Sequence, residues 1–384
     1  MSATDPADTT LRAWAYLSRV AEPPRPDLAA LVGRVGPIEA AERIRRGAVN
    51  PELAKHTAAR REIDRSTDDL ELLARRGCRL ITPDDDEWPL LAFAAFDGAA
   101  AGAAGRKRYC LPPLALWAQG PARLADTAQR AAAVIGTRAA TSYGELVAAD
   151  LAAGLAERDV AVVAGGSYGI EGAAHRGALA VDGTTVAVLA GGIDICSPVG
   201  HSALLHRIGE QGLLVTEYPP GFRPLGYRFL TRNRLVAALS GATVVVEAGL
   251  RSGTANTAAW AWLLGRLVAA VPGPVTSAAS AGCHKLLRAG AELVTRAEEV
   301  IELAGRAGEL APEPPRPATP LDGLSDAERQ VYDALPGRGV ATVDQIAVAS
   351  GLAPAQVFGP LAMLEVAGLA QRSDGSWGIV RSSR

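Results

Sequence analysis

The strongest chemical signal in this chain is a group of arginines that leads into a glycine-containing loop. Between Gly221 and Arg251 there is a single acid, Glu247, although the whole chain of 384 residues has a formal charge of −2. The arginines of this stretch are Arg223, Arg228, Arg232, Arg234 and Arg251. The last of them opens the loop Arg251-Ser252-Gly253-Thr254, which follows an apolar run. Arginine beside a Gly/Ser/Thr loop at a strand's carboxyl end suits a phosphate, so we predict a phosphate-binding edge here.

Arg232 and Arg234 stand two residues apart on a segment with helical character, with Asn233 between them. Residues at i and i+2 do not share a helix face. We therefore expect these two arginines to have different tasks, one toward a ligand and one toward the protein. The alternative for any single arginine is plain solvation at the surface, but the whole cluster beside a glycine loop favours a binding site.

Two further loops resemble backbone cradles. Gly136-Thr137-Arg138 follows the apolar run Ala-Ala-Ala-Val-Ile, and Ser142 is placed to cap the next helix. In the second loop, Gly165, Gly166 and Gly169 let the backbone approach a ligand closely. Neither loop has the dinucleotide fingerprint G-x-G-x-x-G or a Walker A sequence. The alternative for the first loop is a structural turn from strand to helix, and we favour phosphate binding there.

We expect neither a metal site nor a catalytic centre nor a cofactor. Glu171 and His175 stand at i and i+4, which is compatible with a metal or acid–base pair, but a local contact is the simpler interpretation because no further ligands are suitably spaced. The four cysteines are scattered, which argues against zinc and against a disulfide framework. No nucleophile–base set and no paired carboxylates are readable from the spacing.

The segment 130–305 alternates apolar strand patterns with helical patterns. The strands are predicted at 132–136, 160–165, 185–190, 213–217, 243–247 and 267–271, and the helices at 144–157, 171–181, 201–211, 228–239 and 254–265. Val-rich strands that are apolar on both faces are typical of a covered parallel sheet. The sequence therefore predicts an α/β, Rossmann-like, doubly wound and mostly parallel sheet, within a domain at 81–305, whose glycine loops converge on one edge.

Residues 1–80 are predicted to form a helical domain, because leucines and other apolar residues recur at helical spacing. Gly33-Arg34-Val35-Gly36 is compatible with a helix–hairpin–helix turn, so the domain is predicted to be SAM-like or helix–hairpin–helix-like, although a plain helix-joining turn is the simpler alternative. A short strand is predicted at 79–82 and an edge strand at 114–120. The acidic, then Ala/Gly-rich stretch 84–105 is predicted to be a loop.

A Pro-rich linker at 306–320 precedes a module at 321–384 whose order of three helices and two short strands is typical of a winged helix. This module contains five arginines and seven acids, and its third helix, 354–367, has no Lys or Arg. Duplex affinity depends mainly on phosphate neutralisation. We therefore predict a protein-contact or regulatory role for this module.

The motifs, taken together, resemble the DNA-processing protein A (DprA/Smf) family. The resemblance covers about 110–305 through VIGTRAATSYG, GGSYGIEGAAHRGAL, TTVAVLAGGID, TRNRLVAALS, VVVEAGLRSGTANTA and AGCHKLLRAGAELV, and the C-terminal module is similar to the family's winged helix. It implies a cytoplasmic homodimer that binds single-stranded DNA, protects incoming DNA in natural transformation and helps to load the RecA recombinase, with no established catalytic activity. The longest apolar runs are too short to span a bilayer, and the first residues lack a secretory signal pattern.

Carried over motif by motif, the resemblance assigns DNA contacts to several residues of this chain. These are Arg138 of the Gly-x-Arg loop, Arg232, Asn233 and Arg234 of Arg-Asn-Arg, and Ser252, Gly253 and Thr254 of the last loop. We add Ser142, Gly165, Gly166 and Arg251 from the loops themselves.

The chain departs from the family's sequence pattern at three places. Tyr168 replaces a basic residue, Glu171 replaces Asp, and Arg228-Phe229-Leu230 replaces Asn-Phe-Pro. Tyr168 is then expected to stack on a base and Arg228 to restore charge, and weaker DNA binding is the alternative.

A different class of function is a nucleoside-monophosphate phosphoribohydrolase of the LOG type, which shares the Gly loop. Here the segment 252–258 lacks the acid that such an enzyme needs.

Overall fold

The computed structural model describes residues 6–102, 110–250, 252–305, 308–313 and 321–380. It separates the chain into two compact units, Met1–Pro312 and Glu313–Arg384. Arg251, one of the predicted DNA contacts, lies outside the described residues.

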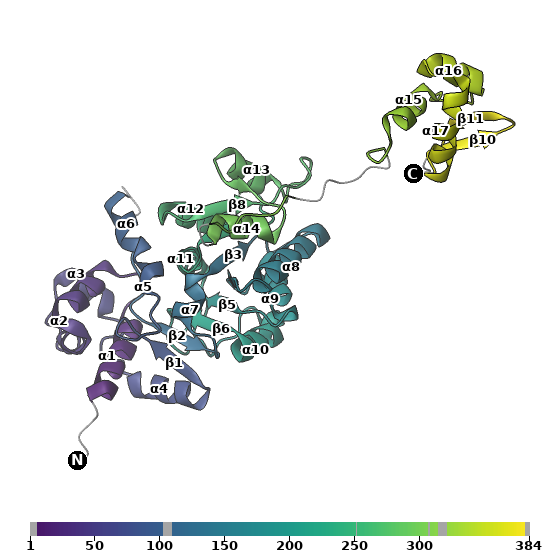
Figure 1. Ribbon diagram of the computed structural model, residues 1–384. Coiled ribbons are helices and arrows are strands. Elements are labelled where there is room, and N and C mark those ends of the chain that lie inside the picture. Colours follow the sequence, from purple (N-terminus) through teal and green to yellow (C-terminus); the bar gives the residue numbers. More distant parts are fainter. Residues whose placement is uncertain (1–5, 103–109, 251, 306–307, 314–320, 381–384) are drawn as a thin grey trace. The chain divides into compact units, whose positions relative to one another are not determined.

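The first unit is built on a nine-stranded sheet with the order β1-β2-β6-β5-β4-β3-β7-β8-β9 (Figure 1). The strands are β1 (Cys78–Ile81), β2 (Leu116–Gln119), β3 (Ala131–Ile135), β4 (Ala161–Ala164), β5 (Thr185–Leu189), β6 (Leu213–Thr216), β7 (Ala242–Val245), β8 (Leu267–Ala270) and β9 (Glu292–Leu293). The pairings from β6 to β9 are parallel, and only β1–β2 and β2–β6 are antiparallel. The predicted mostly parallel sheet is therefore confirmed.

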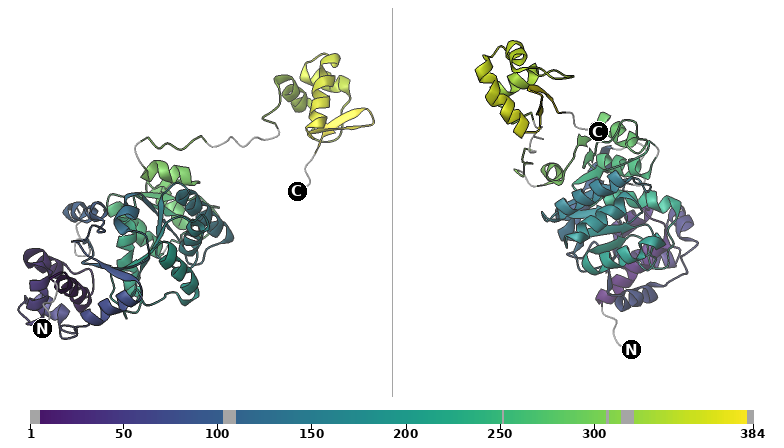
Figure 2. Two further views of the ribbon diagram at one scale, coloured as in Figure 1. Left: turned by 60° about the horizontal axis from the view of Figure 1, so that its bottom comes forward. Right: turned by 90° about the vertical axis from the view of Figure 1, so that its right-hand side faces the viewer.

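Helices cover both faces of this sheet. They are α1 (Pro6–Val20), α2 (Pro26–Arg45), α3 (Pro51–Thr57), α4 (Ser66–Arg75), α5 (Leu90–Phe93), α6 (Ala95–Gly102), α7 (Leu124–Gln129), α8 (Ser142–Ala156), α9 (Ile170–Ala180), α10 (Ser202–Gln211), α11 (Gly226–Ala238), α12 (Gly253–Leu263), α13 (Ala281–Arg288) and α14 (Ala297–Ala304). The helices α1–α4, drawn in purple to blue, lie toward the β1 end, and the green α13 lies toward the β8 end (Figures 1 and 2).

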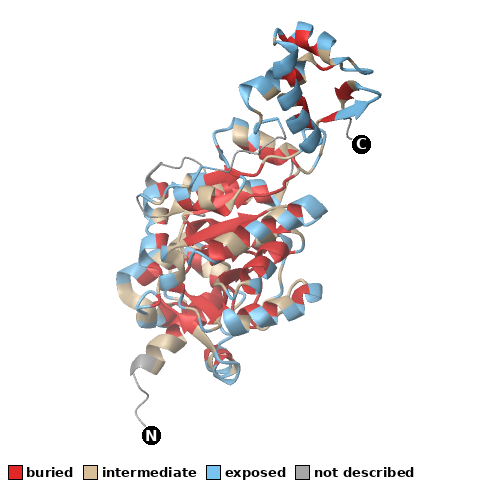
Figure 3. Cartoon of the chain, turned by 45° about the vertical axis from the view of Figure 1, so that its right-hand side comes forward, coloured by how far each residue is buried: buried red, intermediate tan, exposed pale blue. Residues whose placement is uncertain are grey.

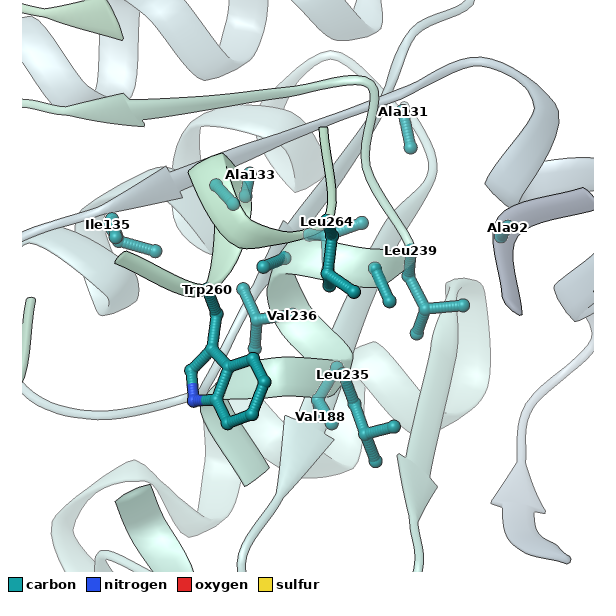
Figure 4. Close-up of a cluster of buried hydrophobic side chains, with 14 of the residues drawn as sticks. Ala92, Ala131, Ala133, Ile135, Val188, Leu235, Val236, Leu239, Trp260 and Leu264 are labelled. Carbon is teal, nitrogen blue, oxygen red and sulfur yellow. The ribbon is translucent and has the colours of Figure 1, made fainter. Parts of the chain in front are cut away.

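The alternation of side chains along β3 shows why the chain folds in this way. Ala131, Ala133 and Ile135 belong to a core cluster with α11 and α12, whereas Ala132 and Val134 belong to a cluster with α8 and α9. Figure 4 shows part of the first cluster, with Trp260 of α12 among the labelled side chains. A strand buried on both faces has no polar side, and the central strands are red throughout in Figure 3.

Two sequence-based expectations for the first unit are wrong. The stretch 84–105 is not all loop, because α5 and α6 occupy much of it, and Phe93 and Phe96 are buried in the core. The strand β2 is not at the edge, since β1 pairs with it on its outer side. A run of Ala and Gly is ambiguous between helix and loop, and an antiparallel neighbour from a distant segment leaves no local sequence signal.

The N-terminal helices share a core with the sheet. Trp14 and Leu17 of α1 belong to the same buried cluster as Leu189 of β5 and Leu214 of β6. Within α2, Gly36 adopts φ 77° and ψ 169°, which breaks the helix before Pro37. The turn that the sequence predicts between two helices therefore lies at this glycine.

The second unit consists of α15 (Asp326–Ala334), α16 (Val343–Ser350), α17 (Pro354–Val366), β10 (Ala370–Ser373) and β11 (Ser376–Ile379). The two strands form an antiparallel hairpin, and Val331, Ile346, Leu361 and Trp377 contribute to a core of its own. This is the predicted order of a winged helix. Among the described residues no single helix is long and apolar enough to cross a membrane, and α16 with α17 meets that criterion only as a pair bent by 102°.

Candidate nucleic-acid interface

The glycine loops after β3 and β4 and the first turns of α11 and α12 converge on one pocket of about 550 Å³, here called the arginine pocket. It lies beyond the carboxyl ends of the parallel strands, where open α/β sheets bind ligands. Its lining residues are Ile135, Gly136, Thr137, Arg138, Ser167, Glu171, Gly226, Phe229, Leu230, Arg232, Asn233, Ser252, Gly253, Thr254 and Thr257. The predicted convergence of the loops on one edge is therefore confirmed.

Arg232 is the buried cation of this pocket. Its side chain is 4% exposed, and its Nη1 donates to the carbonyl oxygen of Val188 at 2.5 Å. A Cβ on Gly165 would lie 1.8 Å from Nη1, so the guanidinium occupies the space that glycine leaves. The Nε atom is buried without a partner. Burial lowers the pKa of Arg232, against the attraction of Glu171 and together with the repulsion of Arg138, so an anion here would stabilise its charge.

Arg138 supplies a second, exposed cation at the mouth of the pocket. Its guanidinium carbon lies 5.0 Å from the ring centroid of Phe229, within the range of a cation–π contact. The preceding Thr137 donates its N–H to the carbonyl oxygen of Glu247 at 2.8 Å. The loop is therefore tied to the end of β7 while the Arg138 side chain remains accessible to a ligand.

Glu247 is a structural residue of the site that sequence reasoning did not identify. Its carboxylate accepts from the Thr141 N–H at 2.9 Å and from the Thr141 hydroxyl at 2.6 Å. Gly144 leaves room for it, since a Cβ there would meet Oε2 at 2.3 Å. Thr141, and not Ser142, caps α8 by accepting from the Gly144 N–H. Ser142 is the first residue of that helix, so its predicted capping role is wrong. It also does not line the pocket.

The N-terminus of α12 forms the opposite wall. The N-cap Ser252 makes no side-chain capping bond, and its hydroxyl is buried without a partner. Gly253 and Thr254 follow as the first helical residues, and Asn233 Nδ2 donates to the Gly253 carbonyl oxygen at 3.3 Å. The first N–H groups of a helix have no intrahelical acceptor and carry a partial positive charge. This wall therefore suits an anion.

Glu171 and His175 act within the protein. Glu171 Oε2 accepts from the Ser167 N–H at 2.9 Å, which closes the second glycine loop. His175 is fully buried and lies 2.7 Å from the Thr185 hydroxyl through Nδ1. Burial lowers the pKa of His175 to about 4, so the ring is neutral near pH 7. Among the described residues no group of His, Cys, Asp or Glu is arranged to hold a metal ion.

Two of the predicted arginine contacts lie elsewhere. Arg234 is fully buried, and its Nη2 bonds both carboxylate oxygens of Glu217 at 2.6 Å. Arg228 is 5% exposed and donates to both oxygens of Glu22, with Nη2–Oε1 at 2.6 Å. Neither lines the arginine pocket. The expectation that both face a phosphate therefore does not match their geometry, because each neutralises an internal carboxylate.

Tyr168 is half-exposed, outside the residues that line the pocket. Its hydroxyl accepts from the Gly200 N–H at 3.1 Å, and its ring packs edge-on against His201 at 4.7 Å. Gly165 and Gly166 contribute because they have no Cβ. The absence of a Cβ at Gly165 makes space for the Arg232 guanidinium, and it lets Gly166 adopt φ 75°. Asn233, Ser252, Gly253 and Thr254 line the pocket, and their contact with DNA stays a prediction.

Comparison with known proteins places this arrangement in a family. Residues 79–305 match the model of DNA recombination-mediator protein A, and residues 312–376 match the DprA winged helix domain. A "Putative DNA processing protein DprA" of Mycobacterium tuberculosis is 73% identical over 376 residues, which are 98% of this chain and 96% of that protein. "Protein Smf" of Escherichia coli is 38% identical over 62% of this chain and 64% of its own length.

The fold agrees with this match. The crystal structure of DprA from Streptococcus pneumoniae aligns with a TM-score of 0.56 and 26% identity, over 78% of this chain and 96% of that one. The fold and pocket define a Rossmann-like protein with a basic ligand edge and an appended winged helix. The chain belongs to the DNA recombination-mediator protein A (DprA/Smf) family.

Proposed function

We propose that the chain binds single-stranded DNA at the arginine pocket, and that it is a binding protein and not an enzyme. The observation that carries this is the meeting of Arg138, Arg232 and the first turn of α12 in one concave site of about 550 Å³. Charge-assisted Arg–phosphate bonds and helix N-termini hold the backbone of a nucleic acid.

The shape and the aromatic lining favour a single strand over a duplex. Phe229 lines the pocket beside Arg138, and its ring offers a stacking face to an unstacked base. Bases of a duplex are stacked and paired, so their faces are not accessible to such a ring. Tyr168 is displaced from the pocket lining, so we now propose a secondary contact for it at most.

The test is a titration of a labelled oligo-dT with the full chain at several salt concentrations. Arg138→Ala and Arg232→Ala should each weaken binding about tenfold or more, as expected for a charged hydrogen bond worth about 1.5–3 kcal/mol. Each should also reduce the log–log salt slope by about 0.7. Arg138→Lys should retain part of the affinity, because it keeps the charge and loses the planar fork.

Arg158→Ala is the matched control for these variants. Arg158 follows the C-terminal end of α8, whereas the loop that carries Arg138 precedes the N-terminal end of this helix. It forms surface ion pairs with Glu157 and Glu298, so its removal should leave binding unchanged. Equal affinity and salt slope for wild type, Arg138→Ala and a folded Arg232→Ala would exclude the arginine pocket as the DNA site.

Family membership supports a finer proposal, in which the DNA-bound protein acts as a homodimer, protects incoming DNA in natural transformation and helps to load the RecA recombinase in the cytoplasm. The test is to measure RecA-dependent ATP hydrolysis on single-stranded DNA coated with a single-strand-binding protein, with and without this chain. Stimulation by wild type but not by Arg138→Ala would support it. Incubation with AMP tests the alternative, since release of adenine would indicate a LOG-type phosphoribohydrolase.

A further inference from the structure

A second pocket of about 460 Å³ lies against the other side of α11. It is bounded by the segment that joins α1 to α2, by one face of α11 and by α12. Its lining residues are Glu22, Pro23, Pro24, Arg25, Tyr227, Leu230, Thr231, Arg234, Asn256 and Trp260. We call it the Tyr227 pocket, and the family motifs quoted above do not include three of its lining residues, Arg25, Tyr227 and Trp260.

The two pockets adjoin. Leu230 lines both of them. Asn233 of the arginine pocket donates through Nδ2 to Asn256 Oδ1 of the Tyr227 pocket at 3.3 Å, so one hydrogen bond between α11 and α12 separates them. The α11 residues of both pockets lie within Gly226–Arg234, which is about 13 Å of helix at 1.5 Å per residue. A strand held by its phosphates in one pocket therefore passes close to the other.

The walls of the Tyr227 pocket suit a flat aromatic ligand. The Tyr227 side chain is 51% exposed. The Arg228 guanidinium carbon lies 5.7 Å from its ring centroid, and Glu22 holds that guanidinium in place. One side of the ring is thus supported while much of its surface remains open. Trp260 and the two prolines add apolar walls. Base–aromatic stacking of this kind contributes about 1–3 kcal/mol per base.

Arg25 provides the polar group that a base edge would need. It is partly buried, its Nε is buried without a partner, and among the described residues nothing forms an ion pair with it. Glu22, the acid beside it, is already bonded by Arg60 and Arg228. Arginine donors match the carbonyl oxygens of thymine and guanine. The buried Arg234 also lines this pocket, and its Nη2 donates to Glu217.

We propose that the Tyr227 pocket receives one unstacked nucleobase of the same strand whose phosphates lie in the arginine pocket. This inference rests on the proposed function, because it needs a bound strand. An apolar side chain of a protein partner would also fit the walls. The nucleobase is favoured because the pocket adjoins the phosphate site and because Arg25 has an unpartnered donor to offer.

The test compares two oligomers of about 16 nucleotides, a typical site size, one of dT and one with the same backbone but abasic at every position. Tyr227→Ala should weaken binding of dT about 5- to 150-fold and leave binding of the abasic oligomer unchanged. Tyr227→Phe, which keeps the ring, should bind both as wild type does. Arg25→Ala should weaken dT binding with an unchanged salt slope, since a base edge carries no phosphate charge.

The outcomes separate this inference from the function on which it rests. If wild type binds dT but Tyr227→Ala binds both oligomers as wild type does, or loses affinity for both equally, the base pocket is wrong and DNA binding stands. If wild type binds neither oligomer, the proposed function fails and the inference fails with it. Circular dichroism checks that Tyr227→Ala is folded, and Tyr227→Leu serves as a second variant that also lacks the ring.

Discussion

Arginines on the two faces of α11 have opposite roles, one toward the ligand pocket and one within the protein core. Arg232 lines the arginine pocket and donates only to a backbone carbonyl oxygen, that of Val188, whereas Arg234, two residues further, is fully buried and bonds both oxygens of Glu217. Residues at i and i+2 lie on different sides of a helix, so one turns to the ligand edge and the other to the end of β6. The density of arginines in a sequence therefore overstates the positive charge that a ligand meets.

The largest expected effect concerns the buried pair. Arg234→Ala should destabilise the protein by about 3–5 kcal/mol, because it leaves the Glu217 carboxylate buried without its partner. Replacing both residues by apolar side chains should recover much of that loss. The measurement is urea unfolding of the single and double variants. A stable Arg234→Ala variant that fails only in DNA binding would contradict the contrast between the two faces.

The next effect concerns His175, a buried group of the helix α9 that follows the second glycine loop. His175 has a folded pKa of about 4 because of burial, against about 6.5 when unfolded. Between these values the unfolded chain binds a proton that the native chain does not. The free energy of unfolding should therefore fall by up to about 3 kcal/mol as the pH drops from about 6.5 to about 4.

The measurement for His175 is the free energy of unfolding at pH 7 and near pH 4.5. His175→Gln should lose this part of the pH dependence, whereas His206→Gln, which removes an exposed side chain in a surface pair with Glu210, should retain it. An identical pH profile for wild type and His175→Gln would mean that other groups determine acid sensitivity.

Sequence alone was sufficient for the parallel sheet, the winged-helix order and the convergence of the loops, because Val- and Ala-rich strands and glycine turns are local signals. It could not assign Arg228 and Arg234, since their partners Glu22 and Glu217 are distant in the chain and only the fold brings them together. For the same reason Glu247 was missed as the residue that organises Thr141. The family motif names residues that matter without saying whether they matter to the ligand or to the core.

A smaller effect tests the ligand face of α11 through a glycine. Gly165→Ala should displace the Arg232 guanidinium, because the new methyl group would lie 1.8 Å from Nη1. Binding of oligo-dT should fall about tenfold. Combined with Arg232→Ala it should cause little further loss, since both changes remove one contact. Gly249→Ala is the control, because a Cβ there meets nothing within 4 Å. Additive losses would show that Gly165 acts independently of Arg232.

The smallest expected effect extends the comparison to the second unit. The exposed side of α17 carries Phe358, Met363 and Val366, and the helix has no Lys or Arg, in contrast to α11. Removing 313–384 should therefore change the affinity for oligo-dT by less than about threefold, or about 0.6 kcal/mol, with an unchanged salt slope. The isolated 321–384 module, which has its own core, should not bind duplex DNA at physiological salt. Tight duplex binding by this module would show that it reads DNA and would contradict the difference drawn between α17 and α11. No duplex binding would agree with the predicted protein-contact role.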